Sequence, residues 1–508
     1  MAVLSVPLAS LPLLSLLIGL PLVGAVLLGL LPARQARSFA LGVGLVEAVL
    51  ACGVVWGINP EQAGFQWLEQ GRWIPTLHLQ YLLGVDGLSA LFLPLSALLF
   101  VGLVLASTGV QRLPRLYFAL LLALEGITIG IFSALDLLLF FLFWELTLIP
   151  LYFLVSLWGI GPQRRFAATQ YTLWMLGGGV LLLFGFLLVA TGHGDWPAAT
   201  DGFRAPAALL FDLPTLLATP LPPERQWPVF LLLLMGFAVK TPVVPLHIWL
   251  PTVAMEGPVV VVAMMTGLKL GAYGLIRFAL PLAPQVAQEW YGVLVGLGVV
   301  GIFYGGLLAL VQSNLRRLLA FASISHVGFV LLGLSTFTVQ GVQGALLQLL
   351  NFTLIASGLF LLAGFIRQRT DSTELVHLGG LVHSMPKASR FFLFFGLAGM
   401  GMPLTAGFPA EQLILLGSLS AYKGAALAAI GGQILGAGYF FHYYRRAFLG
   451  PARHRLVVQA VDLLPREWAI MVLLAIPVLV VGIYPGWILH FTQLPVVRWV
   501  AQFPGVAP

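Results

Sequence analysis

The stretch FLFWELTLIP, residues 141–150, places one carboxylate, Glu145, inside a long run of apolar side chains. A run of about 20 apolar residues is what an α-helix needs to cross a bilayer. A charged side chain at the centre of such a helix costs about 2.5–3.5 kcal/mol on insertion scales, unless pairing or hydration offsets the cost. The stretch therefore indicates a membrane-spanning helix in which something must stabilise Glu145.

The composition extends this interpretation to the whole chain. Of the 508 residues, 60% are hydrophobic and only 8% are charged. Apolar runs long enough to span a membrane recur along the sequence, so we expect one all-α polytopic membrane domain covering residues 1–508. The single cysteine, Cys52, excludes an internal disulfide and an iron–sulfur cluster held by several cysteines of this chain.

The hydropathy pattern predicts about fourteen spans, with Asp136 marking a short turn between the fourth and the fifth. Their approximate ranges are 11–32, 39–58, 87–108, 115–133, 134–157, 168–191, 228–249, 258–281, 291–312, 318–336, 341–366, 390–418, 422–446 and 467–490. We expect the first range to be a spanning helix, not a signal peptide, because no basic residue precedes it. Residues 192–227 should form an external loop and residues 367–389 a cytoplasmic one.

The basic residues support an even number of spans. With the N-terminus outside, alternate loops hold 17 of the 25 Lys and Arg residues. Cytoplasmic loops carry this excess in membrane proteins, so both termini should lie on the outer, periplasmic or lumenal side of a bacterial inner membrane or a thylakoid membrane. The same clustering accounts for the net charge of +7 without nucleic acid as a partner.

A small set of ionisable residues remains inside the predicted spans. They are Glu125, Glu145, Lys240, Lys269 and Glu411, with His326 and His442 as titratable neighbours. Such residues usually face the interior of a helical bundle and mark ion pathways or proton relays.

Two of these residues lie beside predicted helix breaks. Pro242 and Pro245 follow Lys240 in MGFAVKTPVVP, and Glu411 ends the Gly- and Pro-rich stretch GMGMPLTAGFPAE. Proline breaks a helix, and broken helices at membrane depth recur at transporter sites. The two breaks are five spans apart, an odd number, which predicts two inverted repeats over residues 115–281 and 291–446.

The charges suggest a proton relay that needs no metal or cofactor. Movement of Glu145 relative to Lys240 would change how tightly the lysine holds its proton. Lys269 could pass the proton through water and His326 towards Glu411. Taken alone, each residue also has a structural interpretation. Glu145 could be an ion-pair partner, and Lys269 could extend to the surface. His326 could form a hydrogen bond with a neighbouring backbone group, and Glu125 could be a packing contact. Two lysines and two acids in separate spans are hard to explain by packing alone.

Six stretches together resemble the antiporter-like subunits of respiratory complex I, most closely the M-type (chain 4) subunit of NADH-quinone oxidoreductase and its cyanobacterial relatives. They are LGVDGLSALF (83–92), FFLFWELTLIPLYFL (140–154), GFAVKTPVVPLHIWLP (236–251), GLKLGAYG (267–274), SNLRRLLAFASISHVGFVLLG (313–333) and MPLTAGFPAEQLILLG (402–417). Their order and spacing cover the chain from about residue 80 to residue 450.

The resemblance implies fourteen helices, two inverted five-helix repeats and broken seventh and twelfth helices. It implies a proton-translocating subunit of a redox-driven complex, with Glu145 and Lys240 as a coupled pair, Lys269 as the central relay, His326 as a bridge and Glu411 as the terminal group. Flavin, iron–sulfur clusters and quinone would belong to partner subunits, and this chain would carry no redox chemistry. L-type and N-type antiporter-like subunits would be its neighbours in the bilayer.

The sequence departs from the family pattern in three places. Thr252 and Ala254 stand where the family usually has Asp and His, whereas Glu256 and Pro258 are kept. A further His-Gly pair of the family is replaced within Asn351, Phe352 and Thr353. Arg316 replaces a lysine and is expected to matter little, because the prediction places it in a loop.

These departures leave other functions open. A paralogue could work in an Mrp-type cation/proton antiporter, a membrane-bound hydrogenase or a CO2- or bicarbonate-uptake complex, because one fold serves all of these. A scaffold without transport is disfavoured, since apolar residues would be less costly to insert than the intramembrane charges.

Overall fold

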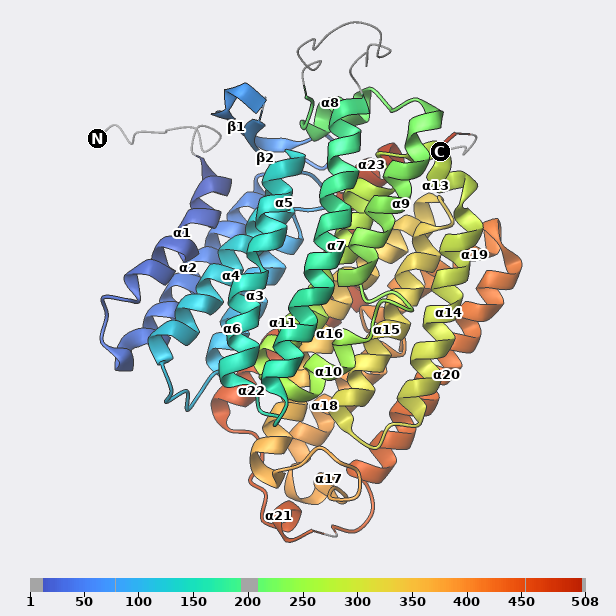
Figure 1. Ribbon diagram of the computed structural model, residues 1–508. Coiled ribbons are helices and arrows are strands. Elements are labelled where there is room, and N and C mark those ends of the chain that lie inside the picture. Colours follow the sequence, from blue (N-terminus) through green and yellow to red (C-terminus); the bar gives the residue numbers. More distant parts are fainter. Residues whose placement is uncertain (1–11, 78, 193–208, 453, 505–508) are drawn as a thin grey trace, which may run out of the picture.

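The computed structural model describes residues 12–77, 79–192, 209–452 and 454–504, and these form a bundle of long helices that lie side by side (Figure 1). Among the described residues, ten helices are long and apolar enough to cross a membrane, and two shorter apolar helices accompany them. The expected helical membrane bundle is thereby confirmed.

The first part of the chain packs along one side of the bundle. Its elements are α1 (Leu13–Leu27), a 3-10 turn (Ala33–Gln35), α2 (Ala36–Trp56), β1 (Gln66–Ile74), a 3-10 turn (Pro75–Leu77), β2 (Leu79–Val85) and α3 (Phe92–Ala106). The next part holds α4 (Pro114–Ser133), α5 (Leu137–Leu146), α6 (Leu148–Trp158), α7 (Arg164–Gly192), α8 (Leu213–Ala218), α9 (Pro223–Lys240), α10 (Trp249–Glu256), α11 (Val259–Gly267), α12 (Leu270–Gly274) and a π-helical turn (Leu275–Ala279).

Most of the remaining helices fill the centre and the opposite side of the bundle (Figure 1). They are α13 (Pro284–Glu289), α14 (Tyr291–Leu310), α15 (Leu315–Leu334), α16 (Val339–Thr370), α17 (Leu381–Ser384), α18 (Pro386–Gly399), α19 (Gly407–Ala421), α20 (Lys423–Ala447), α21 (Arg455–Val458), α22 (Pro465–Ile483) and α23 (Gly486–Val500). Helix α16 is the most central, because it is buried along almost its whole length and contacts α11, α15, α18 and α19.

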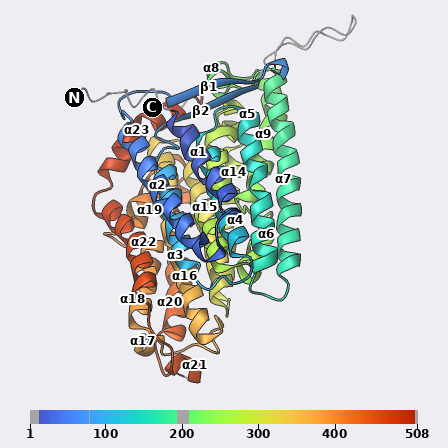
Figure 2. The same ribbon diagram turned by 90° about the vertical axis from the view of Figure 1, so that its left-hand side faces the viewer.

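The β-hairpin corrects the all-α prediction. Strands β1 and β2 pair antiparallel and lie across one end of the bundle (Figure 2). The carboxylate of Glu69 in β1 accepts hydrogen bonds from the backbone nitrogens of Leu14 (2.7 Å) and Ser15 (3.0 Å), so it caps α1. Asp136 caps α5 and also accepts from the backbone nitrogen of Gln80 in β2 (3.2 Å). The hairpin is thus held by helix ends, which a hydropathy pattern does not register.

Several predicted boundaries also change. The last predicted span ends at residue 490, but the structure ends α22 at Ile483 and adds α23. Of the predicted external loop 192–227, residues 193–208 lie outside the described residues, and the rest contains α8 and the start of α9. The predicted cytoplasmic loop 367–389 contains the end of α16, all of α17 and the start of α18.

Both interruptions that the prolines predict are present. Helix α9 ends at Lys240, and the chain becomes helical again only at Trp249. Helix α18 ends at Gly399, and α19 begins at Gly407. The structure adds an interruption that the sequence did not predict, at Lys269, whose φ of +45° lies in the left-handed region between α11 and α12. Each of the three breaks therefore lies at or near an intramembrane charge.

Two arginines have structural roles that the sequence did not reveal. Arg277 forms a buried, bidentate ion pair with Asp86, which ties the start of α3 to the π-helical turn. The prediction that Arg316 matters little is wrong. Its side chain is buried and donates to the backbone oxygens of Met255 (3.0 Å) and Gly257 (2.7 Å), so it fixes the turn between α10 and α11.

Candidate functional site

Lys240 is held at the junction of α5 and α6 by two residues that flank Glu145. Its ammonium donates to the hydroxyl of Thr147 (2.8 Å) and to the backbone oxygen of Trp144 (3.3 Å). The same nitrogen lies 4.0 Å from the centroid of the Trp144 ring, a cation–π contact. Because α9 ends at Lys240, its side chain leaves a helix terminus and reaches the junction between α5 and α6.

Glu145 lies near this lysine but is not fixed to it. The carboxyl of Glu145 interacts electrostatically with the ammonium of Lys240. Among the described residues, however, no salt bridge joins the two side chains. Oε1 of Glu145 is buried without a hydrogen-bond partner. Gly179 of α7 makes the space for this carboxyl, since a Cβ there would lie 2.0 Å from Oε1. Glu145 is therefore half-buried, close to a cation and without a fixed partner.

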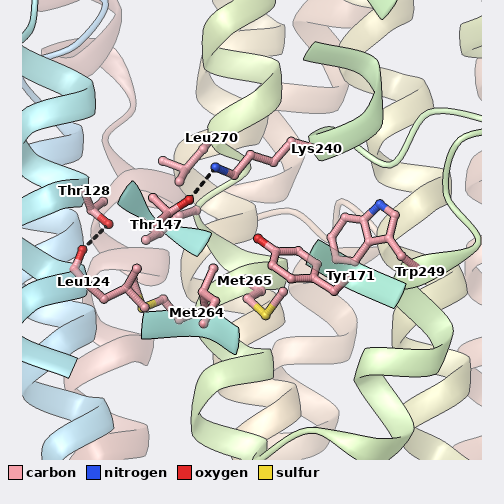
Figure 3. Close-up of a pocket in the computed structure, with 11 residues that line it drawn as sticks. Leu124, Thr128, Thr147, Tyr171, Lys240, Trp249, Met264, Met265 and Leu270 are labelled. Carbon is pink, nitrogen blue, oxygen red and sulfur yellow. Dashed lines mark hydrogen bonds between the residues drawn. The ribbon is translucent and has the colours of Figure 1, made fainter. Parts of the chain in front are cut away.

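A small cavity lies next to Lys240 (Figure 3). Its volume is about 40 Å³, and Thr128, Thr147, Tyr171, Lys240 and Trp249 are among the residues that line it. A water molecule needs about 10–15 Å³ of such space and at least two polar partners. The cavity can therefore hold water against the lysine.

The break at Lys269 packs directly on the break at Lys240. Gly271 follows Lys269, and a Cβ there would lie 2.5 Å from the backbone nitrogen of Thr241. Only a residue without a side chain permits this approach, so the two interrupted helices meet beside their lysines. The ammonium of Lys269 itself donates to the hydroxyl of Ser323 on α15 and is buried.

His326 lies one turn beyond Ser323 on the same face of α15. Its Nδ1 lies 3.0 Å from Nε2 of Gln348 on α16. Because an amide nitrogen only donates, Gln348 supplies the proton of this bond and Nδ1 accepts it. Phe352 packs against the histidine ring, with 4.1 Å between the ring centroids, and its own centroid is 5.4 Å from Nζ of Lys269. Phe352, from the segment in which the family often has a His-Gly pair, thus lies between Lys269 and His326.

Glu411 is enclosed in the second half. Only 3% of the residue is exposed, and its Oε2 accepts a hydrogen bond from Nε2 of Gln433 on α20 (2.9 Å). The side chain of Gln348, which donates to His326, also lies close to this carboxyl. A second cavity of about 30 Å³ is lined by His326 and Tyr439, among other residues. The structure therefore brings Lys269, His326 and Glu411 into one buried polar chain.

The structure separates Glu125 from this chain. Glu125 is buried in α4, and its surroundings include Ser96 of α3 and a second acid, Glu47 of α2. Glu47 was not among the predicted site residues, although its place in the apolar stretch GLVEAVL was a sufficient signal. His442 lies on α20, where its Nε2 is 3.5 Å from Nη1 of Arg446.

Other polar residues of the site were also missed. They are Thr147, His247, Ser323, Gln348 and Gln433. His247 follows the break after Lys240, is buried, and places its Nε2 3.2 Å from the hydroxyl of Tyr304. Its position in VVPLHIWLP, just after the two prolines, could have identified it. The other four are uncharged, and their roles depend on contacts between distant helices. Within the described part of the chain, no three His, Cys, Asp or Glu side chains are grouped as metal ligands would be.

The sequence pattern of the family described as NADH:quinone oxidoreductase/Mrp antiporter, transmembrane, matches residues 134–436. The chain belongs to this family. It is 38% identical over 510 residues to NAD(P)H-quinone oxidoreductase chain 4 1 of Synechococcus sp. (strain JA-3-3Ab), covering 98% of this chain and 94% of the relative. It is 36% identical to NADH-quinone oxidoreductase subunit M of Rhodobacter capsulatus, covering 93% of each.

Solved structures agree with this assignment. A chain of respiratory complex I from Thermus thermophilus with bound NADH superimposes with a TM-score of 0.85 at 31% identity, covering 97% of this chain and all of that chain. A chain of the Mrp complex from Dietzia sp. DQ12-45-1b superimposes with a TM-score of 0.82 at 21% identity, covering 96% and 98%. The second likeness shows a shared fold. The antiporter-like membrane fold is therefore established for this chain.

Proposed function

We propose that this chain is a proton-translocating subunit of a complex I-type NAD(P)H- or ferredoxin-quinone oxidoreductase. The observation that carries the proposal is the row of buried polar groups in the bundle. It starts at Lys240 with its cavity and the adjoining break at Lys269, and it continues through the side chains of Ser323, His326 and Gln348 to Glu411. Buried ionisable groups linked in this way are typical of proton relays.

In this relay Glu145 is the movable group. With one carboxyl oxygen unpartnered, it can approach or leave Lys240, which changes the free energy of the protonated lysine. Water in the adjacent cavity carries the proton from Lys240, and the contact between the two breaks leads it to Lys269. The proton then moves from Lys269 to Glu411 along α15. Because an amide does not exchange its protons readily, Gln348 cannot itself pass the proton on. Water therefore completes the transfer past this residue.

The relatives named as NAD(P)H-quinone oxidoreductase chain 4 and subunit M support the redox context. We propose that flavin, iron–sulfur clusters and quinone lie in partner subunits, that L-type and N-type antiporter-like subunits flank this chain, and that its role is the movement of protons. Fourteen membrane crossings, arranged as two inverted repeats with both termini on the outer side, complete the proposal.

The test uses the intact complex in sealed membrane vesicles. Lys240→Ala should lower proton uptake and quinone reduction together, by about 10²-fold, which is typical for loss of a proton-transfer group. Lys423→Ala is the matched control, because Lys423 is exposed at the start of α20. Unchanged turnover and an unchanged proton-to-electron ratio in Lys240→Ala would contradict the proposal.

Mass spectrometry of the purified complex tests the redox context separately. Copurification with flavin- and iron–sulfur-bearing dehydrogenase subunits is expected. Recovery with a hydrogenase, a zinc-binding soluble protein or only other antiporter-like chains would instead place the chain in one of the related machines. Sodium transport driven by a pH gradient, without dependence on NAD(P)H or ferredoxin, would identify a cation antiporter.

A further inference from the structure

The first four helices contain a buried acid that has no place in the relay. Glu47 lies on α2, whose outer face is exposed at Val46 (52%) and Val49 (72%), whereas Glu47 itself is 0% exposed. Both of its carboxyl oxygens are buried, and neither has a hydrogen-bond partner in the described structure. An ionised carboxylate in such a place would lack any compensation for its lost hydration.

A second buried acid lies close to Glu47. Glu125 of α4 is 1% exposed, and its Oε1 is buried without a hydrogen-bond partner in the described structure. A Cβ at Gly24 of α1 would lie 3.3 Å from Val43 of α2 and 3.4 Å from Leu122 of α4, so these two helices meet on α1 about one turn before the two acids. The carboxyls of Glu47 and Glu125 are close enough to interact electrostatically. The packing around the two acids is close. A Cβ at Gly126 would lie 2.8 Å from the backbone oxygen of Ile18 in α1, and one at Gly44 would lie 2.8 Å from the ring of Phe100 in α3.

The neighbouring elements supply no cation to the two acids. Helices α1 and α3 contain no ionisable residue between Leu13 and Leu27 or between Phe92 and Ala106. On α2, Arg37 lies ten residues before Glu47, about 15 Å along the helix, and it donates to the backbone oxygens of Val104 and Leu105.

No cation reaches the two acids from the described parts of α4, α5, α6 or the turn before α2. Tyr117 on α4 bonds Ser107 (3.0 Å), and Arg115 donates to Gly29 near the other end of the helix. On α5, the charged partner of Glu145 is Lys240, and Asp136 caps the helix start. The only ionisable side chain on α6 is that of Tyr152. Arg34 belongs to the 3-10 turn that precedes α2. The acid next to Glu47 is therefore also its only charged neighbour among the residues described on these elements.

We propose that Glu47 and Glu125 form a proton-sharing carboxyl pair, a proton-binding site that lies off the line from Lys240 to Glu411. Two adjacent carboxylates cannot both be ionised without a counter-ion, so one proton held between them removes one charge and gives an unpartnered oxygen a donor. The pair then titrates as one unit.

Protonation of the pair can affect the relay through the cavity beside Lys240. Leu124 and Thr128, which flank Glu125 on α4, line the cavity beside Lys240. A change in the proton occupancy of the pair therefore changes the charge on a helix that borders this cavity. The site itself does not depend on the proposed function, since the pair can hold a proton whether or not the chain translocates protons.

Infrared difference spectroscopy of the intact complex in lipid tests the pair. Glu47→Gln, Glu125→Gln and the double variant keep the size of the side chains and remove the acid. At neutral pH, the double variant should lose a deuterium-sensitive carbonyl band of one protonated carboxyl per chain. Each single variant should shift the band of the acid that remains, because its hydrogen-bond partner has become an amide. Glu61→Gln, at an exposed site, should change no such band.

Three results would overturn the proposal. An unchanged band in the double variant would mean that both acids are ionised. Bands that disappear one by one, without a shift of the other, would mean two independent acids. Loss of the wild-type band when sodium replaces potassium would mean that the two acids bind a cation.

A measurement on the unmodified chain covers the case of variants that fail to assemble. A hydrophobic carbodiimide reacts with protonated carboxyls in membranes, and peptide mapping should find it on Glu47 or Glu125 but never on both in one chain. Labelling of both acids, or of neither under conditions that label another buried acid, would contradict a shared proton.

Discussion

Glu145 and Glu411 lie at opposite ends of the same polar chain, yet their surroundings differ. Glu145 is half-buried, and one of its oxygens has no hydrogen-bond partner. Glu411 is enclosed and accepts a hydrogen bond from Gln433, with Gln348 close by. The surroundings leave the first acid room to reorient and hold the second in place. In the proposed relay, we therefore place the conformational step in the first half and a fixed proton-binding step in the second.

The largest effect should follow from removing the fixed acid. Glu411→Leu should abolish proton translocation and also destabilise the chain, because the amide of Gln433 loses a buried acceptor at about 1–3 kcal/mol. Glu411→Gln separates the two effects, since it restores an acceptor but not the proton. Thermal unfolding and proton uptake of the reconstituted complex measure them; equal stability of both variants would show that Glu411 is not held by this amide.

A methyl group at Gly179 should impair the movable acid without changing any titratable group. In Gly179→Ala, the new Cβ would lie 2.0 Å from Oε1 of Glu145, so the carboxyl must turn away. We expect proton uptake to fall by about 10²-fold, the order of magnitude that a misplaced group costs in catalysis. Gly177→Ala on the same helix is the matched control, because nothing lies within 4 Å of its Cβ. Equal activity of both variants would remove the argument that Glu145 needs this space.

Thr147→Val should have a smaller effect on the first half. It removes the 2.8 Å hydrogen bond from Lys240 while keeping the shape of the side chain. A hydrogen bond to a charged group contributes about 1.5–3 kcal/mol, and Lys240 keeps its bond to the backbone oxygen of Trp144, so turnover should fall by about tenfold. Thr147→Ser keeps the hydroxyl and should retain activity. If serine fails as valine does, packing rather than the hydrogen bond explains the loss.

Gln433→Leu should have the smallest effect, because Gln348 remains beside Glu411. The loss of one hydrogen bond costs about 1 kcal/mol, a factor of about five. Gln348→Leu removes the hydrogen bond to His326 as well as the amide beside Glu411 and should cost more. The rates of proton uptake of these two variants, compared at equal quinone reductase content, decide the order; the reverse order would show that His326 does not communicate with Glu411 through Gln348.

The sequence predicted the parts of the site that local chemistry determines. Pro242 and Pro245 predicted the helix break after Lys240, and the Gly- and Pro-rich stretch before Glu411 predicted the second helix break. The break at Lys269 has no proline, and only the contact of Gly271 with Thr241 explains why the chain turns there. Ser323 and Gln348 could not be recognised, since their roles arise from contacts between helices far apart in the sequence.

In the fold, too, the sequence predicted the features that depend on local residues but not those that depend on contacts between distant elements. Hydropathy located most of the long helices, because apolar length is a local property. It missed the hairpin of β1 and β2, which is held by the end of α1 through Glu69 and by Asp136 at the start of α5. It also treated Arg316 as a loop residue, although two backbone carbonyls from the turn between α10 and α11 enclose its side chain.

The most direct test of the account is the proton-to-electron ratio of Glu145→Gln, Glu411→Gln and the double variant in the intact complex. If one relay connects the movable acid to the fixed acid, either single change interrupts it. The double variant should then translocate no fewer protons per electron than the more impaired single variant. Losses that add in the double variant would show two independent routes and would contradict a single relay.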